Sequence, residues 1–379
     1  MEWIVLTGVA LLAAGGGYAI WRGSRREAAG DDAVVREATA RFEALRKEDP
    51  SVTHEQAQIE DEAPVDASEL LARLFALNLG LENANDVRTP VHTAIEEATS
   101  ATLEDLANHP RHLPRRPSLL PQVLQAVNDE GASLRGIARL ISQDPTLTGN
   151  LLRIANSPAY RTQPAPIESI ERAVSVLGTH GIRSTIAAAV MQPVLSSGGA
   201  FGNLPELIWD HGLRVASAAE AHAMLVGNDD PFAAQLIGLL DGLASIAIFR
   251  IARDEFTEHP DVGPSPRLLA RLIDQYAGPT AARIAASWEL SRRIVEALDE
   301  QSLAAGAAAP RRSPLGQALY FGRVAGALAL LIEAGSITPE EARAMLPDGK
   351  RHAMQVDRIW ERMLRASKAT KDASTLTKD

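Results

Sequence analysis

Apolar residues recur at helical spacing along most of this chain, with polar residues between them. Leu113 begins a long series of apolar stripes at offsets of three and four residues, and no β-alternating run of useful length interrupts it. Ahead of this series, Ser68 is expected to cap a helix whose apolar face consists of Leu70, Leu71, Leu74, Phe75 and Leu77. Residues 91–106 are expected to form a second short helix. The pattern predicts an all-α fold.

Side chains at the predicted helix ends support the same interpretation. Asp144 and Pro145 form a strong helix start, because the carboxylate accepts from free backbone amides and proline needs no hydrogen bond at the first helical position. Ser169 is expected to cap the next helix, which Gly178 ends. Thr338, followed by proline and two acidic residues, predicts another helix start near the C-terminus.

Two apolar stretches raise the question of membrane insertion. Residues 3–20 carry no charge, and as a helix these 18 residues would rise about 27 Å, close to the ~30 Å thickness of the hydrocarbon core. We therefore expect a transmembrane helix at the N-terminus. Residues 315–333 are also apolar, but Arg323 interrupts a short core, so we expect a buried helix there.

Basic residues on one side of the first stretch predict its orientation. Arginines at 22–26 follow it directly, whereas Glu2 is the charged residue that precedes it. The positive-inside rule therefore predicts a single-pass protein with its N-terminus outside and its C-terminal bulk in the cytoplasm. A cleaved signal peptide is the alternative, although its basic residues normally precede the apolar core. Ala13 and Gly17 have the spacing of small residues in helix dimers, which leaves a homodimer open.

Changes in composition divide the chain into six segments. They are a transmembrane anchor (1–22), a charged linker (23–66), an N-terminal helical extension (67–110), a main domain (111–302), C-terminal helices (303–366) and a disordered tail (367–379). The linker is mixed in charge and has little apolar surface to bury, so we expect it to lift the body off the membrane. The last helix is expected over residues 356–364.

Composition narrows the classes of function. The formal net charge of −10 argues against broad affinity for nucleic acid, which needs clustered Lys and Arg to displace counterions, so we expect no nucleic-acid partner. The chain has no cysteine, which excludes disulfides, thiolate zinc sites and thiol nucleophiles. Aromatic residues make up only 4% of the chain while apolar residues reach 46%, which suits closely packed helices.

Several segments of the main domain occur in the order and spacing of a known family. They read ISQDPTLT at 141–148, LLRIANS at 151–157, IESIERAV at 167–174 and VLG at 176–178, with Leu113-Pro114 before them and Ile208-Trp209-Asp210-His211 after them. Across residues 113–298 the chain thus resembles the HDOD family (HD-related output domain). The resemblance implies an HD-like helical bundle that is related to the HD phosphohydrolases but is generally used as a non-catalytic signalling module in bacteria.

One motif of that family is altered in this chain. The family often carries Gly-Leu-Leu-His-Asp-Ile-Gly where residues 238–244 read Gly-Leu-Leu-Asp-Gly-Leu-Ala, so Asp241 and Gly242 stand in the histidine and aspartate positions. His211 matches the first histidine of the HD pattern, and His222 lies about three turns further along the same face. A hydrolytic metal centre needs several convergent His and carboxylate ligands, and one matched ligand does not supply them. We therefore expect no metal and no cofactor.

These observations predict a protein that is not an enzyme. We expect His211 and Asp241 to line a remnant pocket, with His211 hydrogen-bonded inside it, and Arg153 and Asn156 to offer an interaction surface beside the signature helix. The expected role is a membrane-tethered, non-catalytic signalling or regulatory module that is anchored in the inner membrane through residues 3–21 and works through an unidentified protein partner. Two alternatives stay open: a divergent metal-dependent HD-type phosphohydrolase with rearranged ligands, and a cyclic-nucleotide sensor that binds without cleaving.

Overall fold

The computed structural model describes residues 65–82, 88–106, 108–114, 116, scattered positions from 121 to 177, 198–301, 312–348 and 350–376. The predicted anchor and nearly all of the predicted linker lie outside the described residues. So do Asp144, Pro145, Arg153 and Gly178.

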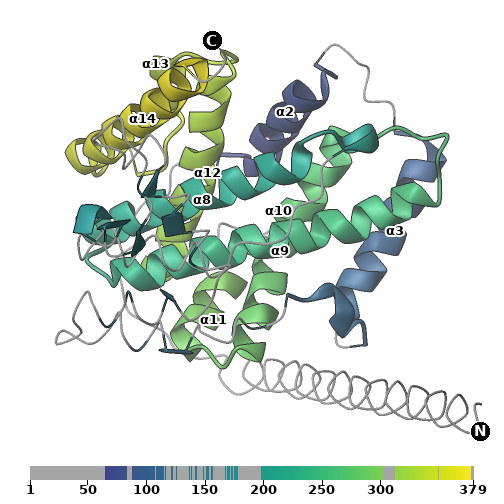
Figure 1. The fold of residues 1–379 in the computed structure, drawn as a ribbon. Helices are drawn as coiled ribbons and strands as arrows, with labels where there is room; N and C mark the ends of the chain where they lie inside the picture. Colours follow the sequence, from purple (N-terminus) through teal and green to yellow (C-terminus); the bar gives the residue numbers. More distant parts are fainter. Residues whose placement is uncertain are drawn as a thin grey trace, which may run out of the picture.

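The described part of the chain consists of helices and connecting turns, without a strand, as the apolar pattern predicts (Figure 1). Its elements in chain order are α2 (Ala67–Leu79), α3 (Pro90–Glu104), η1 (Pro110–His112), η2 (Gly199–Phe201), α8 (Leu204–His222), the π-helix η3 (Ala223–Gly227), α9 (Pro231–Thr257), α10 (Pro266–Ser287), α11 (Arg292–Asp299), α12 (Pro314–Glu333), α13 (Pro339–Ala344) and α14 (Ala353–Leu376).

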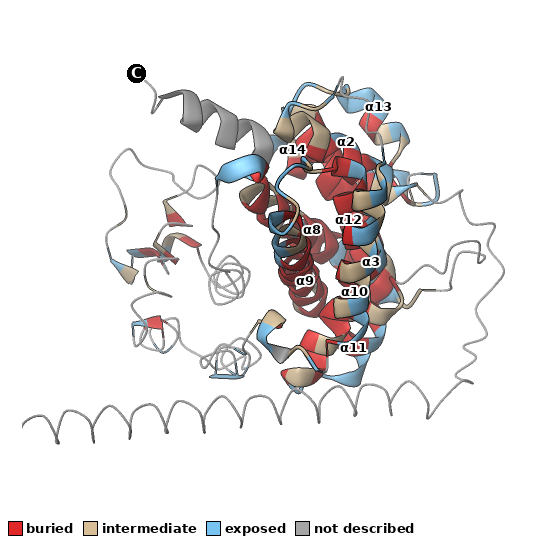
Figure 2. Ribbon diagram, turned by 90° about the vertical axis from the view of Figure 1, so that its right-hand side faces the viewer, coloured by how far each residue is buried: buried red, intermediate tan, exposed pale blue. Residues whose placement is uncertain are grey.

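Helices α8, α9, α10 and α12 form the centre of the bundle, where buried residues predominate (Figure 2). Helix α9 is buried on nearly all sides because alanine, glycine, leucine and isoleucine cover its whole circumference. Within the described residues, α9 and α12 are long and apolar enough to cross a membrane by length and composition. However, 94% and 89% of their apolar windows are buried inside the bundle, which confirms the prediction that residues 315–333 form a buried helix.

The predicted N-terminal extension packs into the same core as the main domain. Phe75 of α2 and Leu103 of α3 belong to one hydrophobic cluster with Trp209 of α8 and Leu240 of α9. We expected the helices of residues 303–366 to form a group separate from the main domain. The first of them, α12, packs directly against α8 and α9. The boundaries at 110 and 302 therefore mark changes of sequence pattern, and packing is continuous across them.

Two helix ends near the termini of the described chain differ from the sequence prediction, whereas the start of α13 agrees with it. Thr338 caps α13 and exchanges hydrogen bonds with Glu341, as predicted. The cap of α2 is Asp66 and not Ser68, because the Asp66 carboxylate accepts from the backbone amides of Ser68 and Glu69. Helix α14 continues to Leu376, so most of the segment expected to be a disordered tail is helical. The alanines and lysines of that segment favour a helix.

Candidate remnant pocket

His211 lies on α8 inside the bundle, and its side chain is only 5% exposed. Its Nε2 lies 3.1 Å from the backbone carbonyl oxygen of Arg323 on α12. A carbonyl only accepts, so Nε2 carries a proton, and the lowered pKa of His211 keeps the ring neutral near pH 7. Burial lowers the pKa of His211 to about 4; the bond to the carbonyl opposes this shift, while the charges of Arg323 and Arg214 add to it. His211 is therefore a hydrogen-bonded core histidine, as we predicted.

Arg323 joins two acidic side chains beside His211. Its Nη2 donates to Oδ1 of Asp274 on α10 at 3.1 Å, and its Nε lies 3.8 Å from Oδ2 of Asp241 on α9. Arg323 and Asp241 are buried, whereas the Asp274 side chain is 28% exposed. Thus the side chain of one residue of α12 contacts acids from two other helices.

Charges within this group shift one another's pKa. Burial raises the pKa of Asp241 and Asp274 raises it further, while Arg323 opposes the shift. Burial alone would lower the pKa of Arg323, but the two carboxylates outweigh it and the pKa lies above its ordinary value. The guanidinium therefore stays charged, and it favours the ionised form of Asp241 against the effect of burial.

The doublet position is closed by contact between helix backbones. An ideal Cβ at Gly212 of α8 would lie 2.8 Å from the Cα of Gly242 on α9, and one at Gly242 would lie 3.0 Å from the Cα of Gly212. One turn earlier on α9, a Cβ at Gly238 would lie 2.5 Å from the Cα of Ala216. Real Cβ atoms essentially never come as close as those at Gly212 and Gly238 would, and the contact at Gly242 would be tighter than nine in ten real ones. Helices α8 and α9 therefore approach each other this closely because these positions lack side chains.

The residues present do not fit a catalytic divalent metal. The Nε2 of His211 donates to a carbonyl, Asp241 faces a permanent cation, and Gly242 has no ligand atom. Among the residues that the structure describes, no group of three or more His, Asp and Glu side chains could hold a metal ion. A hydrolytic site needs such a group together with an open position for water.

His222 does not join His211, although both lie on α8. Its Nε2 lies 3.1 Å from Oδ2 of Asp348, in the loop between α13 and α14, and its ring packs on Phe321 with centroids 4.8 Å apart. Burial would raise the pKa of Asp348, but hydrogen bonds from His222 and Gln317 outweigh it and lower the pKa. His222 therefore links the C-terminal helices to the bundle.

Asn156, a predicted surface residue, uses its amide within the fold. Its Nδ2 donates to the carbonyl oxygens of Leu152 at 2.9 Å and Ile167 at 2.8 Å, and its Oδ1 accepts from the Ile167 amide at 2.7 Å. Ser169, two residues later, accepts from the Arg172 amide and caps its helix as predicted. The other predicted surface residue, Arg153, lies outside the described residues.

Sequence reasoning overlooked Arg323 and Asp274 as members of this site. In the sequence, Arg323 served only as an argument against a membrane span. The usable signal was the arginine itself: a charge within twenty mostly apolar residues needs a buried counter-ion.

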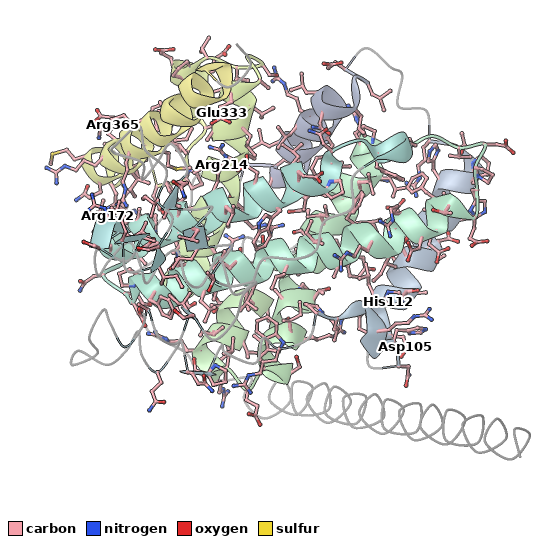
Figure 3. All side chains as sticks on the ribbon, in the orientation of Figure 1. Asp105, His112, Arg172, Arg214, Glu333 and Arg365 are labelled. Carbon is pink, nitrogen blue, oxygen red and sulfur yellow. The ribbon has the colours of Figure 1, made fainter. Side chains whose placement is uncertain are left out.

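A second ion pair joins α8 to α12 outside the pocket. Arg214 of α8 pairs with Glu333 at the end of α12 at 3.0 Å (Figure 3). Arg214 also pairs with Asp210 at 3.3 Å.

Comparison with known proteins gives one family and a few distant relatives. Residues 113–303 match the model of the HDOD domain family. An uncharacterized protein of Treponema pallidum (strain Nichols) is 21% identical over 215 residues, which are 55% of this chain and 41% of that protein. This chain thus spans about two fifths of that relative's length.

Solved structures of similar proteins are also distant in sequence. A Shewanella amazonensis protein, provisionally named a metal-dependent phosphohydrolase, is 18% identical, covers 75% of this chain and 99% of its own, and has a TM-score of 0.48. An HDOD domain protein of unknown function from Geobacter sulfurreducens is 20% identical, covers 72% of this chain and 98% of its own, and has a TM-score of 0.46.

Proposed function

Because the chain belongs to the HDOD family, which is signalling-related, we propose that it is a non-catalytic regulatory module that acts through protein–protein contacts. The backbone contact between Gly212 and Gly242 carries this proposal. The aspartate of an HD doublet would need a Cβ at position 242, 3.0 Å from the Gly212 Cα, so α8 would have to move back by a few tenths of an ångström to admit it. The neutral ring of His211 and the pairing of Asp241 with Arg323 support the same conclusion.

We further propose that residues 3–21 tether this module to the inner membrane, with the bundle in the cytoplasm. Attachment to a membrane raises the effective concentration of two proteins held there, so a weak contact with a partner becomes sufficient. The chain that follows the linker is fastened on entering the bundle, because the Val65 amide donates to the Tyr320 hydroxyl at 3.0 Å. Arg312 in turn covers the Tyr320 ring, with its guanidinium carbon 4.1 Å from the centroid.

Hydrolysis assays test the non-catalytic part of the proposal. The full chain in detergent is incubated with p-nitrophenyl phosphate and bis-p-nitrophenyl phosphate in the presence of Mn²⁺ or Mg²⁺. His211→Gln is the matched control, because glutamine keeps a donor for the Arg323 carbonyl while removing the imidazole. We expect equal background rates for the two proteins. Turnover in the wild type that His211→Gln abolishes would establish the phosphohydrolase alternative.

A reporter fusion tests the topology. Alkaline phosphatase, which is active outside the cytoplasm, is fused after Lys47, and we expect it to be inactive there. Activity of this fusion would place the bundle on the other side of the membrane.

Crosslinking in intact cells tests the interaction part, with residues 24–379 as the chain that lacks the anchor. We expect specific crosslinks of the anchored chain that weaken when the anchor is removed and again in Arg153→Glu. Identical crosslinks from all three chains would argue against both the tether and this surface.

A further inference from the structure

Arg323 is the point at which the four central helices meet. Its backbone carbonyl on α12 accepts from His211 of α8, and its guanidinium reaches Asp241 of α9 and Asp274 of α10. These contacts join residues 112, 82 and 49 positions apart in the chain. Arg323 therefore crosslinks the bundle at the place where the family motif has its ligand positions.

The charges of this group require a cation at its centre. Asp241 is buried and one of its oxygens, Oδ1, has no hydrogen-bond partner among the described residues, so its negative charge depends on Arg323. Asp274 adds a second negative charge at Nη2 of the same guanidinium. Without the cation that both contact, two neighbouring carboxylates would repel each other inside a medium of low dielectric constant.

Close packing keeps the position of that cation fixed. A Cβ at Gly322, beside Arg323, would lie 2.6 Å from the Val215 carbonyl oxygen, so α12 touches the backbone of α8 at this level. The backbone that carries Arg323 is therefore fixed against α8, and its side chain starts from a fixed point beside Asp241 and Asp274.

We infer that the guanidinium of Arg323 is a built-in cation that takes over the neutralising and crosslinking role of a metal, in a cavity shaped for a planar guanidinium. The inference builds on the proposed function and extends it: the pocket is filled and stabilised by the chain itself. It follows that a chain lacking the Arg323 side chain has a vacant, negatively lined cavity of guanidinium size.

Chemical rescue tests this inference. The full chain carrying Arg323→Ala is expected to unfold at a temperature about 10 °C lower than the wild type, because it leaves two carboxylates unpaired. Guanidinium chloride at ~20 mM, on the order of a hundredfold below denaturing concentrations, is expected to raise the Tm of the variant by several degrees. Sodium chloride at the same concentration should leave it unchanged, and guanidinium should not raise the Tm of the wild type.

The outcomes separate this inference from the proposed function. Guanidinium that affects Arg323→Ala no more than sodium chloride would overturn the built-in cation, whatever the hydrolysis assay shows. Turnover that depends on His211 would overturn the proposed function, whatever guanidinium does to the variant.

A double variant keeps the test informative if Arg323→Ala does not fold. Arg323→Met with Asp241→Asn removes the cation together with the buried acid that depends on it. We expect this chain to have a higher Tm than Arg323→Met alone, because the unpaired charge is gone. A Tm equal to or below that of the single variant would contradict the inference.

Discussion

Helix α8 carries two buried histidines, His211 and His222, whose surroundings differ. The side chains are 5% and 1% exposed, so burial does not distinguish them. His211 donates to a backbone carbonyl beside a guanidinium, whereas His222 bonds to the carboxylate of Asp348. Histidine takes its role from its partner: near the middle of α8 it is a neutral part of a closed pocket, and at the C-terminal end it fastens a loop.

The part of α8 that lines the pocket resists substitution because its backbone meets that of α9 there. Restoring the family doublet with Asp241→His and Gly242→Asp inserts a Cβ against Gly212 and removes the acid that faces Arg323. We expect the free energy of unfolding to fall by about 4 kcal/mol or more. Denaturation followed by tryptophan fluorescence measures it.

Gly263→Asp is the matched control for the restored doublet, because Gly263 has open space around its Cβ position. Its effect is expected to stay within about 0.5 kcal/mol. Wild-type stability of the variant with the restored doublet would contradict the claim that contact between α8 and α9 closes this position.

A pH titration sharpens the contrast at His211. Its pKa is 6.5 in the unfolded chain and about 4 in the folded one, so protons bind preferentially to the unfolded state as the pH falls between these values. This residue alone should cost about 3 kcal/mol of stability between pH 7 and pH 4, and His211→Gln should lack that loss. The raised pKa of Asp241 makes the fold more stable as the pH falls, and this effect is shared by the wild type and His211→Gln. Identical pH profiles would show that folding does not lower the pKa of His211.

The contact of His222 with Asp348, at the C-terminal end of α8, is tested by Asp348→Asn. Asparagine keeps the shape and tolerates the positive φ of 58° at this position, so the change isolates the charge on the partner of His222. We expect a loss of about 2 kcal/mol at pH 7. Because the pKa of Asp348 is lowered, its contribution is present above pH ~3.8 and disappears as the pH falls through the folded pKa. Equal stability of the wild type and Asp348→Asn at pH 7 would show that the bond from His222 to Asp348 does not stabilise the fold.

The smallest expected effect concerns the entry of the chain into the bundle. Tyr320→Phe removes the hydroxyl that accepts from the Val65 amide but keeps the ring beneath Arg312. We expect a loss of about 1 kcal/mol and faster exchange of the Val65 amide hydrogen with solvent. Unchanged exchange at Val65 would show that this hydrogen bond does not hold the entering chain.

The sequence was sufficient for features that depend on local pattern. The apolar stripes predicted the helices, the Thr338 cap followed from its neighbours, and Arg323 predicted that residues 315–333 are buried in protein. The cap of α2 was wrong by two residues because Asp66 and Ser68 are equally good candidates in sequence. The anchor and its orientation stay predictions.

Only half of the site could be predicted, because its other residues come from distant parts of the chain. His211 and Asp241 could be found because they occupy motif positions. Arg323 lies 112 positions from His211 and 49 from Asp274, so these residues meet through helix packing that no local pattern encodes. The contact of Gly212 with Gly242 is also invisible in the sequence, because the two glycines lie 30 positions apart on different helices.

Metal analysis tests the central claim most directly. The full chain is equilibrated with Mn²⁺, Zn²⁺ or Mg²⁺, dialysed against metal-free buffer and measured by elemental analysis, alongside His211→Gln. The account predicts the same trace level in both proteins, because Arg323 already supplies the positive charge of the pocket. Stoichiometric metal in the wild type that is lost in His211→Gln would contradict it.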